Sequence, residues 1–224
     1  MSIEEQIAVR EVTEILHFTT NRGLVGSLAC KSLFSRPLLN EEDYLKYVLH
    51  LNSKIRPEEA DYFDKSADWI RFVNLSVSEI NRRFLDVSRK WHTSEDVWWA
   101  ILAFDPQILT HENVWFSTTN NGYEDTIREK GESGFSNLFA PSIIRKLNGT
   151  YGRWSCSRNS REKQLPTCEQ AEVLYPEKLS LQYLNKVYVE DETHSDMVKG
   201  WMGDFDFPDV CVEINTQKFI GQRN

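Results

Sequence analysis

Glu172 is the residue of this sequence whose position most needs a chemical explanation. It lies in the segment Cys168–Pro176, whose alternating residues predict a short β-strand with Glu172 in its middle. Acidic residues are depleted in strands, and a half-buried carboxylate costs free energy unless a partner compensates it. Two explanations stay open. Glu172 either faces solvent on an edge strand, or it lies at the floor of a cleft, where it stabilises positive charge or accepts a proton.

His17 is the second candidate, in the sequence His17-Phe18-Thr19 at the end of the first predicted strand, Val12–Thr20. The plainer explanation is a partly buried histidine that bonds a backbone group. The other explanation is a functional partner of Glu172, which requires the fold to bring two distant parts of the chain together.

The composition limits the class of protein. With 224 residues, 40% of them hydrophobic and 12% aromatic, the chain can bury a core, and we expect one domain over residues 1–224. The net charge of -8 argues against a protein that coats duplex DNA through a general basic surface, but it allows a local basic groove. The polar N-terminus is unlike a signal peptide, and no apolar run reaches membrane-spanning length. We therefore expect a cytoplasmic protein without membrane contact.

Several common sites are not supported by the sequence. No Gly-x-Gly-x-x-Gly follows a predicted strand, and no phosphate loop ends in Gly-Lys-Ser/Thr. The four cysteines form no Cys-x-x-Cys pair, and the five histidines show neither zinc-ligand spacing nor a nucleophile partner. We therefore expect reduced thiols and no metal.

Strands and helices are predicted in no regular alternation, which favours an α+β fold over a doubly wound sheet. The predicted strands are Val12–Thr20, Trp69–Val77, Val97–Phe104, Val114–Thr118, Cys168–Pro176, Leu181–Val189 and Val210–Ile214. The predicted helices are 3–10, a helix capped by Asn21, one from Asn40, Glu79–Lys90, and one from Pro141 to about Lys146. The predicted loops are Ile55–Lys65, Tyr123–Ser136 and 151–168.

Four ordered segments resemble the DarT family of DNA ADP-ribosyltransferase toxins. They are Ile15–Thr19 with the later Leu33-Phe34-Ser35-Arg36, Trp69–Val77, Trp115–Asn120 and Gln170–Leu174. The resemblance spans most of the chain and is specific through the order of its parts. It implies an ADP-ribosyltransferase-like α+β fold in which two packed, mainly antiparallel sheets form an NAD cleft with flanking helices.

The resemblance also implies roles for single residues, with NAD as co-substrate. Glu172 would stabilise the oxocarbenium-like centre formed when the nicotinamide–ribose bond breaks, and would accept a proton from the nucleophile. His17 would bond a ribose hydroxyl of NAD, Thr19 would support the nicotinamide ribose, and the backbone of Phe18 would pair with the carboxamide.

A cation near the pyrophosphate is expected as well. Arg56 has about the position of the family's arginine, which gives it both a catalytic and a cofactor-binding role. Arg71 and Arg83 are the alternatives, and each is also explained by a surface ion pair.

The segment 151–168 carries the hypothesis about the acceptor. It concentrates positive charge in an acidic chain and includes Tyr151 and Trp154, which can stack on bases. A solvated charged loop is the alternative. Since superfamily members recognise targets through the loop before the catalytic Glu, we expect nucleic-acid contacts from Arg153, Trp154 and Arg158. Asn120 is expected to contribute as well, because Trp115–Asn120 resembles a family strand that runs into a substrate-facing loop.

Base modification requires an accessible base, so single-stranded DNA is the expected substrate. The thymine-modifying branch has Tyr-Val-Pro-Phe-Tyr-Phe where this chain has Phe72-Val73-Asn74-Leu75-Ser76-Val77, and it has Arg-Ser-Pro-Met-Leu where this chain has Arg82-Arg83-Phe84-Leu85. These departures put thymine in doubt, and the chain looks more like the guanine-modifying branch, so guanine is the favoured base. The resemblance thus implies a toxin with a cognate antitoxin of the NADAR or macrodomain type, and we expect a monomer. The alternatives are transfer to thymine, RNA or protein, and a non-catalytic nucleic-acid-binding module on the same fold.

Overall fold

The computed structural model describes residues 1–39, 69–149, 152–159, 161–208 and 210–224. The predicted helix from Asn40, the predicted loop Ile55–Lys65 and Tyr151 lie outside the described residues. No helix in the described ranges is long and apolar enough to span a membrane.

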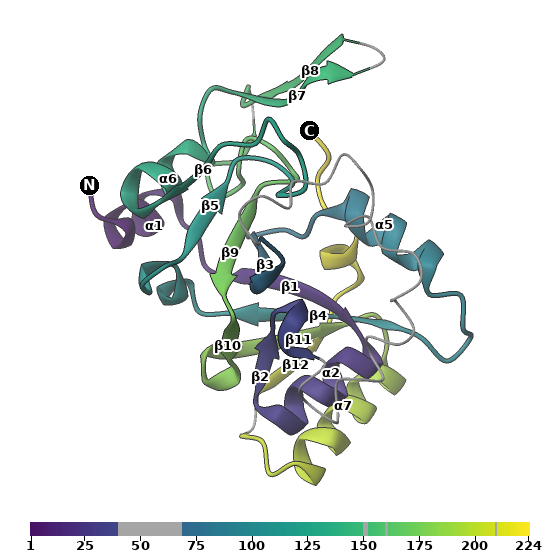
Figure 1. The fold of residues 1–224 in the computed structure, drawn as a ribbon. Helices are drawn as coiled ribbons and strands as arrows, with labels where there is room; N and C mark the ends of the chain where they lie inside the picture. Colours follow the sequence, from purple (N-terminus) through teal and green to yellow (C-terminus); the bar gives the residue numbers. More distant parts are fainter. Residues whose placement is uncertain (40–68, 150–151, 160, 209) are drawn as a thin grey trace.

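An eight-stranded sheet forms the centre of the fold, with strand order β12-β11-β4-β1-β3-β9-β5-β6 (Figure 1). All neighbouring strands are antiparallel except β11 and β12. The strands are β1 Ile15–Thr20, β3 Phe72–Val77, β4 Trp99–Phe104, β5 Trp115–Ser117, β6 Arg128–Lys130, β9 Glu172–Pro176, β11 Leu184–Val189 and β12 Cys211–Ile214. The expected α+β class with mainly antiparallel strands is confirmed.

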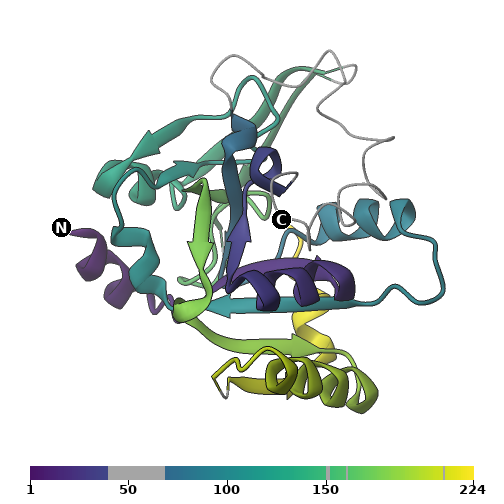
Figure 2. The same cartoon turned by 60° about the horizontal axis from the view of Figure 1, so that its bottom comes forward.

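The sheet opens between β1 and β3. β1 pairs with β4 along its whole length, but with β3 only through Ile15↔Val77 and Leu16↔Ser76. Beyond Leu16 the two strands separate, and β3 and β9 run across the direction of β1 and β4 in both views (Figures 1 and 2). The two sheets expected from the resemblance are therefore two halves of one sheet, joined by a short seam.

Helices cover both halves. They are α1 Ile3–Arg10, α2 Asn21–Cys30, α3 Arg36–Leu39, α5 Arg82–Trp91, α6 Gly131–Asn137 and α7 Glu192–Asp204. Short 3-10 helices are η2 Trp69–Arg71, η3 Pro106–Thr110, η4 Leu181–Tyr183 and η5 Thr216–Phe219. Side-chain oxygens of Ser2, Thr20, Asn81 and Asp191 accept from backbone N–H groups at the starts of α1, α2, α5 and α7, as N-cap residues do. Asn21 is thus the first residue of α2, and Thr20 is its cap.

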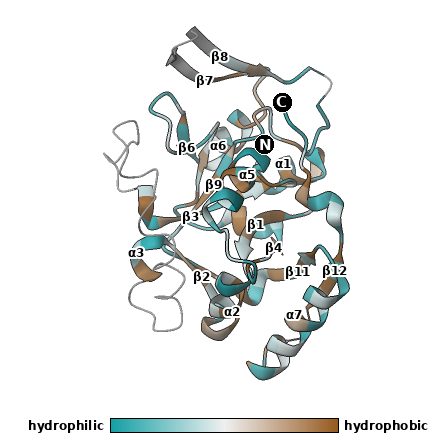
Figure 3. Cartoon of the chain, turned by 90° about the vertical axis from the view of Figure 1, so that its right-hand side faces the viewer, coloured by the Kyte–Doolittle hydropathy of each residue, from teal (hydrophilic) through white to brown (hydrophobic). Residues whose placement is uncertain are grey.

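The core follows the two halves of the sheet. Every residue of β4 is buried, so the apolar run predicted as the strand Val97–Phe104 is a central strand covered on both faces. Hydrophobic residues run along β1 as well (Figure 3), while α2 and α7 lie side by side below it. The packed strand β1 therefore gives rigid support to its own residues after Leu16, which begin with His17.

Two predicted elements differ in the structure. The segment from Pro141 is the strand β7 Ser142–Gly149, paired with β8 Gly152–Ser157, and not a helix. Ile143 and Ile144 are β-branched, and pairing with the next strand, β8, outweighs the local helix-start signal of proline. Residues 123–136, predicted as a loop, contain β6 and most of α6.

A third difference concerns Glu172 itself. β9 begins at Glu172 because Cys168–Ala171 forms a turn, closed by the Ala171 N–H and the Cys168 carbonyl at 3.0 Å. Glu172 is therefore the first residue of its strand, and not a residue in the middle. A further pair of strands, β2 Ser32–Phe34 and β10 Lys178–Ser180, was not predicted, and the segment 151–168, predicted as a loop, contains β8.

Candidate active site

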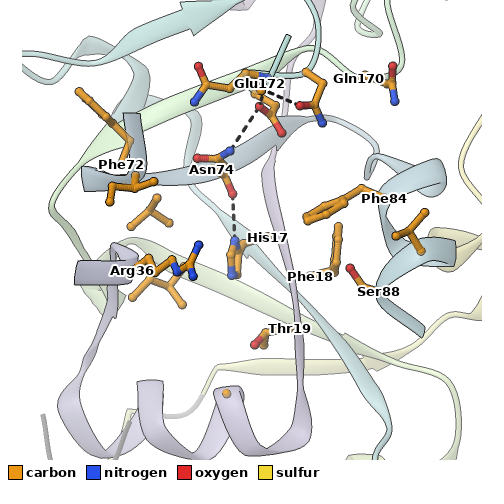
Figure 4. A pocket seen from close by; sticks show the side chains of 18 of the residues that line it. His17, Phe18, Thr19, Arg36, Phe72, Asn74, Phe84, Ser88, Gln170 and Glu172 are labelled. Atoms are coloured by element: carbon orange, nitrogen blue, oxygen red, sulfur yellow. Dashed lines mark hydrogen bonds between the residues drawn. The ribbon is translucent and has the colours of Figure 1, made fainter. Parts of the chain in front are cut away.

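A pocket of about 700 Å³ lies where β1 and β3 separate, within the size range of small-molecule sites. Both halves of the sheet line it, β1 with Thr20 and its neighbours and β9 with Glu172. His17 lies on the opposite side of Asn74 from Glu172 (Figure 4), so the structure brings the early histidine and the late carboxylate into one pocket.

Glu172 is held firmly at the wall of this pocket. Glu172 is only 5% exposed, which excludes the alternative of a carboxylate that faces solvent on an edge strand. Its Oε2 accepts a hydrogen bond from the Asn121 N–H at 2.7 Å and one from Asn74 Nδ2 at 3.3 Å. Burial raises the pKa of Glu172 to about 7, and these two hydrogen bonds oppose the rise. The carboxyl group thus exchanges its proton close to neutral pH.

His17 has a defined tautomer. Its Nδ1 lies 3.0 Å from the Asn74 carbonyl oxygen, which can only accept, so Nδ1 carries the hydrogen. Burial lowers the pKa of His17, although the bond to Asn74 opposes this, and the ring is therefore neutral at neutral pH. The other nitrogen, Nε2, keeps a lone pair and can accept a hydrogen bond from a hydroxyl group.

Asn74 joins the two candidate residues, and the sequence analysis assigned it no role. Its side chain donates to Glu172, and its carbonyl oxygen accepts from His17. A polar asparagine between the apolar residues Val73 and Leu75 of a predicted strand was the signal available in the sequence. Asn121, which donates its backbone N–H, gave no such signal, because every residue except proline carries that group.

Aromatic rings form one wall of the pocket. Phe18 lies 5.6 Å from Phe84 and 5.7 Å from Trp99 between ring centres, and Phe84 lies 6.1 Å from Trp91. All four residues line the pocket. The rings are tilted or edge-on to one another, and together they offer an apolar wall against which a heteroaromatic ring can pack. Thr19, between His17 and α2, lines the pocket as well.

The expected nucleic-acid residues differ in their placement. Asn120 and Trp154 line the pocket, and Trp154 is 41% exposed. Arg153 belongs to β8, but its side chain lies outside the described part of the chain. Arg158 is absent from the pocket lining. Its guanidinium group instead donates to the carbonyl oxygens of Leu165, Glu162 and Lys163. Arg158 therefore closes the loop before β9.

The basic cluster around this loop is more internal than its sequence indicated. Arg145 is 1% exposed, donates to Cys168 Sγ at 3.2 Å and lies 3.5 Å from a Glu169 oxygen. Arg161 pairs with Glu79 and binds the Pro166 carbonyl. These guanidinium groups stabilise the loop because its carbonyls and acids need donors. The positive charge counted along the sequence therefore overstates the charge that faces a ligand.

Arg56, the residue expected to supply a cation near the pyrophosphate, lies outside the described residues. Of its alternatives, Arg71 is exposed and is not part of the lining, while Arg83 lines the pocket but pairs with Glu169. Arg36 at the start of α3 also lines the pocket, and its side chain points toward His17 (Figure 4). The sequence analysis placed Arg36 in a family-like segment without giving it a task.

Within the described ranges, no three His, Cys, Asp or Glu side chains are grouped so that they could hold a metal ion.

Solved structures share this fold at low sequence identity. Thermus sp. 2.9 DarT in complex with NAD+ matches 91% of this chain over 96% of its own, with 15% identity and a TM-score of 0.59. The same protein in complex with ADP-ribosylated ssDNA matches 93% of this chain over 96% of its own, with 10% identity and a TM-score of 0.60. The fold is therefore that of DarT ADP-ribosyltransferases.

A longer protein matches as well. Thermosipho africanus DarTG in complex with ADP-ribose matches 92% of this chain, with 15% identity and a TM-score of 0.56. The chain spans about half of that protein, 51% of its length. No curated protein matches the sequence significantly.

The model of one protein family matches residues 16–220 and is described as ssDNA thymidine ADP-ribosyltransferase, DarT. That range covers most of the sequence, from the residue before His17 to well beyond Glu172. The chain therefore belongs to the DarT family and is an ADP-ribosyltransferase of single-stranded DNA.

Proposed function

We propose that this enzyme transfers ADP-ribose from NAD to a base of single-stranded DNA, with guanine as the favoured base, and that it acts as the toxin of a toxin–antitoxin pair. The observation that carries the proposal is the buried Glu172, fixed by the Asn121 N–H and joined through Asn74 to a neutral His17. This arrangement holds one carboxylate where it can stabilise a positively charged transition state.

The reaction gives Glu172 two tasks. The bond between nicotinamide and C1′ of the ribose breaks, and nicotinamide leaves with the electron pair. A nitrogen of the base then attacks C1′ and loses a proton to the Glu172 carboxylate. A carboxylate near an oxocarbenium-like centre stabilises it electrostatically, and a pKa of about 7 suits a group that takes up a proton at neutral pH.

NAD takes its orientation from the opposite side of the pocket. His17 Nε2 accepts a hydrogen bond from a ribose hydroxyl, because its Nδ1 is already committed to Asn74. Thr19 lies beside the nicotinamide ribose, and the backbone of Phe18 pairs with the carboxamide. The aromatic wall of Phe18 and Phe84 packs on a ring of the dinucleotide.

Arg36 supplies positive charge for the pyrophosphate, alone or together with Arg56. Its position beside His17 supports this role, as does the pairing of Arg83 with Glu169. A guanidinium group can bind two phosphate oxygens at once.

The acceptor strand enters from the Glu172 side. Trp154 is exposed at the pocket and offers a face for stacking a base, with Asn120 and Tyr123 nearby in the lining. The complex of Thermus sp. 2.9 DarT with ADP-ribosylated ssDNA supports DNA as the acceptor. The antitoxin is a NADAR-type or macrodomain-type hydrolase, which the DarTG neighbour supports in general terms.

Thymine is the second candidate base, because the description of the matched family names thymidine. Guanine is favoured by the sequence Phe72–Val77, which departs from the thymine-modifying branch around the very residue, Asn74, that contacts Glu172.

The test mixes protein, NAD and single-stranded oligonucleotides that each contain one kind of modifiable base, with mass spectrometry as the readout. We expect a mass increase of one ADP-ribose on guanine strands, and none with Glu172→Gln. An adduct on thymine strands alone would overturn the base assignment. No adduct on any DNA strand would overturn the proposed reaction.

The toxin role has its own test. Expression of the wild type should arrest growth of a bacterial host, and Glu172→Gln should not, although both proteins accumulate to the same level. Equal toxicity of the two proteins would show that transfer is not the cause, and would favour a non-catalytic binding module.

A further inference from the structure

Arg128 lies near Glu172, and no role has been assigned to it above. It is the first residue of β6. In the sheet register, Ser117 of β5 pairs with Glu172 on one side and with Arg128 on the other. Directly opposed residues of neighbouring strands share a face of the sheet. Arg128 and Glu172 therefore belong to one row across three strands.

The guanidinium group of Arg128 grips the turn that holds Glu172. Its Nε donates to Asn121 Oδ1 at 2.7 Å, and its Nη2 donates to the carbonyl oxygens of Asn121 at 2.5 Å and Tyr123 at 3.3 Å. The N–H of the same Asn121 donates to Glu172 Oε2. One planar side chain thus bonds both the side chain and the backbone of the residue that fixes the carboxylate.

Arg128 is itself fixed by aromatic packing. Its Cζ lies 4.8 Å from the centre of the Trp69 ring, and Trp69 packs edge-on against Trp115 at 5.4 Å. A guanidinium group stacked on an aromatic ring loses little further freedom when it forms hydrogen bonds. The turn is therefore fastened through Arg128 to Trp69 of η2 and Trp115 of β5, and not only to its own loop.

We propose that Arg128 is a positioning residue for the transfer reaction. It locks the 120–123 turn so that the Asn121 N–H stays on Glu172, and so that Asn120 and Tyr123 stay at the acceptor side of the pocket. The inference rests on the proposed function in one respect, that Glu172 is the catalytic carboxylate.

The charges around Glu172 indicate which readout Arg128 should change. Titratable and charged groups reach this region from every adjoining element: His17 on β1, Arg83 on α5, Tyr123 in the turn, Cys168 before β9, and Arg128 on β6. Burial is the main cause of the raised pKa of Glu172, while the Asn121 N–H and the charge of Arg128 lower it and Cys168 raises it. Loss of Arg128 weakens both lowering effects, so less Glu172 is ionised at neutral pH.

The test compares Arg128→Met, Arg128→Lys and the control Lys130→Met. Lys130 lies on the same strand, places its Nζ 4.7 Å from the centre of the Trp115 ring and donates to Asn113, but does not bond the turn. The pH dependence of kcat is measured for transfer to DNA. Arg128→Met should lower kcat at neutral pH by about ten- to hundredfold and move the rising acid limb to higher pH.

Arg128→Lys should keep the limb closer to that of the wild type but still lose activity, because one ammonium group cannot bond three acceptors spread over the turn. Lys130→Met should match the wild type. An unmoved acid limb in both Arg128 variants, with thermal unfolding like that of Lys130→Met, would overturn the inference.

A second readout separates the inference from the proposed function. Hydrolysis of NAD by water, measured as released nicotinamide without DNA, depends on Glu172 but needs no acceptor base. A shifted limb in this assay supports the role of Arg128 even where no DNA adduct forms, in which case the DNA proposal fails alone. An unshifted limb in this assay counts against Arg128 whatever the acceptor.

Discussion

At the scale of single residues, the pocket contains a carboxylate and a histidine that do not form an ion pair. The only described acid in its lining, Glu172, is buried, and the neighbouring His17 is neutral because its pKa is lowered. A neutral histidine does not form an ion pair with the carboxylate, so the negative charge of Glu172 remains available for the transition state. The bond from His17 to the Asn74 carbonyl selects the tautomer that accepts from ribose.

The first prediction concerns Arg36 and the pyrophosphate. Arg36→Gln should weaken NAD binding by about 1.5–3 kcal/mol, roughly ten- to hundredfold in Kd, because it removes hydrogen bonds to a charged group. Binding of nicotinamide riboside, which lacks the pyrophosphate, should change little. Both affinities can be measured by titration calorimetry, and the NAD affinity should also become less dependent on salt.

Arg22→Gln is the matched control, since Arg22 lies on α2 in a surface pair with Asp96 at 2.7 Å. It should bind NAD like the wild type. Equal losses for NAD and nicotinamide riboside in Arg36→Gln would mean that Arg36 supports the pocket without contacting the phosphates.

At the scale of elements, the β5–turn–β6–α6 unit positions the acceptor side of the pocket. β5 pairs with β9 directly at Glu172, and β6 continues into α6 without a connecting loop. α6 packs closely on this unit at Gly134. A Cβ atom there would lie 2.3 Å from the Glu129 carbonyl oxygen and 3.0 Å from a Phe116 ring atom. Position 134 of α6 therefore has no room for a side chain larger than that of glycine.

The second prediction uses this close approach. Gly134→Ala should lower the free energy of unfolding by about 1–3 kcal/mol, because the backbone of β6 or α6 must shift to admit a methyl group. Denaturant unfolding measures the change. Gly200→Ala in α7 is the control, since its Cβ would meet no atom within 4 Å. That substitution should instead raise the free energy of unfolding by about 0.5–1 kcal/mol. Similar effects of both changes would contradict the close packing of α6.

At the scale of the whole molecule, the opening of the sheet sets the site. The seam between β1 and β3 is only two residue pairs long, so the strands can part at His17 and leave a pocket between two packed halves. The main apolar cluster extends through both halves, with Ile15 and Leu102 from one and Val73 and Val173 from the other. The pocket can thus hold a buried carboxylate without loosening the fold.

The third prediction is a linkage between this carboxylate and stability. The folded pKa of Glu172 is raised from 4.5 to about 7, so the native state binds the proton more tightly than the unfolded state. Its contribution to stability is present below pH 4.5 and is lost as the pH rises toward 7 and above. Glu172→Gln removes this loss, and should raise the free energy of unfolding at pH 8 by up to about 3 kcal/mol.

Unfolding in urea at about pH 5 and 8 measures this effect. The difference between Glu172→Gln and the wild type should grow with pH, while Glu112→Gln, at an exposed position, should leave the pH dependence unchanged. A variant that is inactive but no more stable at pH 8 would mean that the folded pKa is not raised.

The sequence predicted the central strands well, because alternation and apolar runs are local signals. Val97–Phe104 and the helix Glu79–Lys90 correspond closely to β4 and α5. It failed at Pro141, where β7 pairs with the next strand β8, and at residues 123–136, where β6 pairs with the preceding strand β5. A three-residue strand such as β6 carries too little pattern to be recognised without its partner.

The sequence by itself determined the α+β class, the two candidate residues His17 and Glu172, and the resemblance to one family. Only the tertiary structure decided that these residues share a pocket, that Asn74 and the Asn121 N–H hold the carboxylate, and that Arg145, Arg158 and Arg161 bind groups of the protein itself. The physical reason is that residue type is a property of the chain, whereas burial, hydrogen bonding and pKa depend on neighbours that only folding brings together.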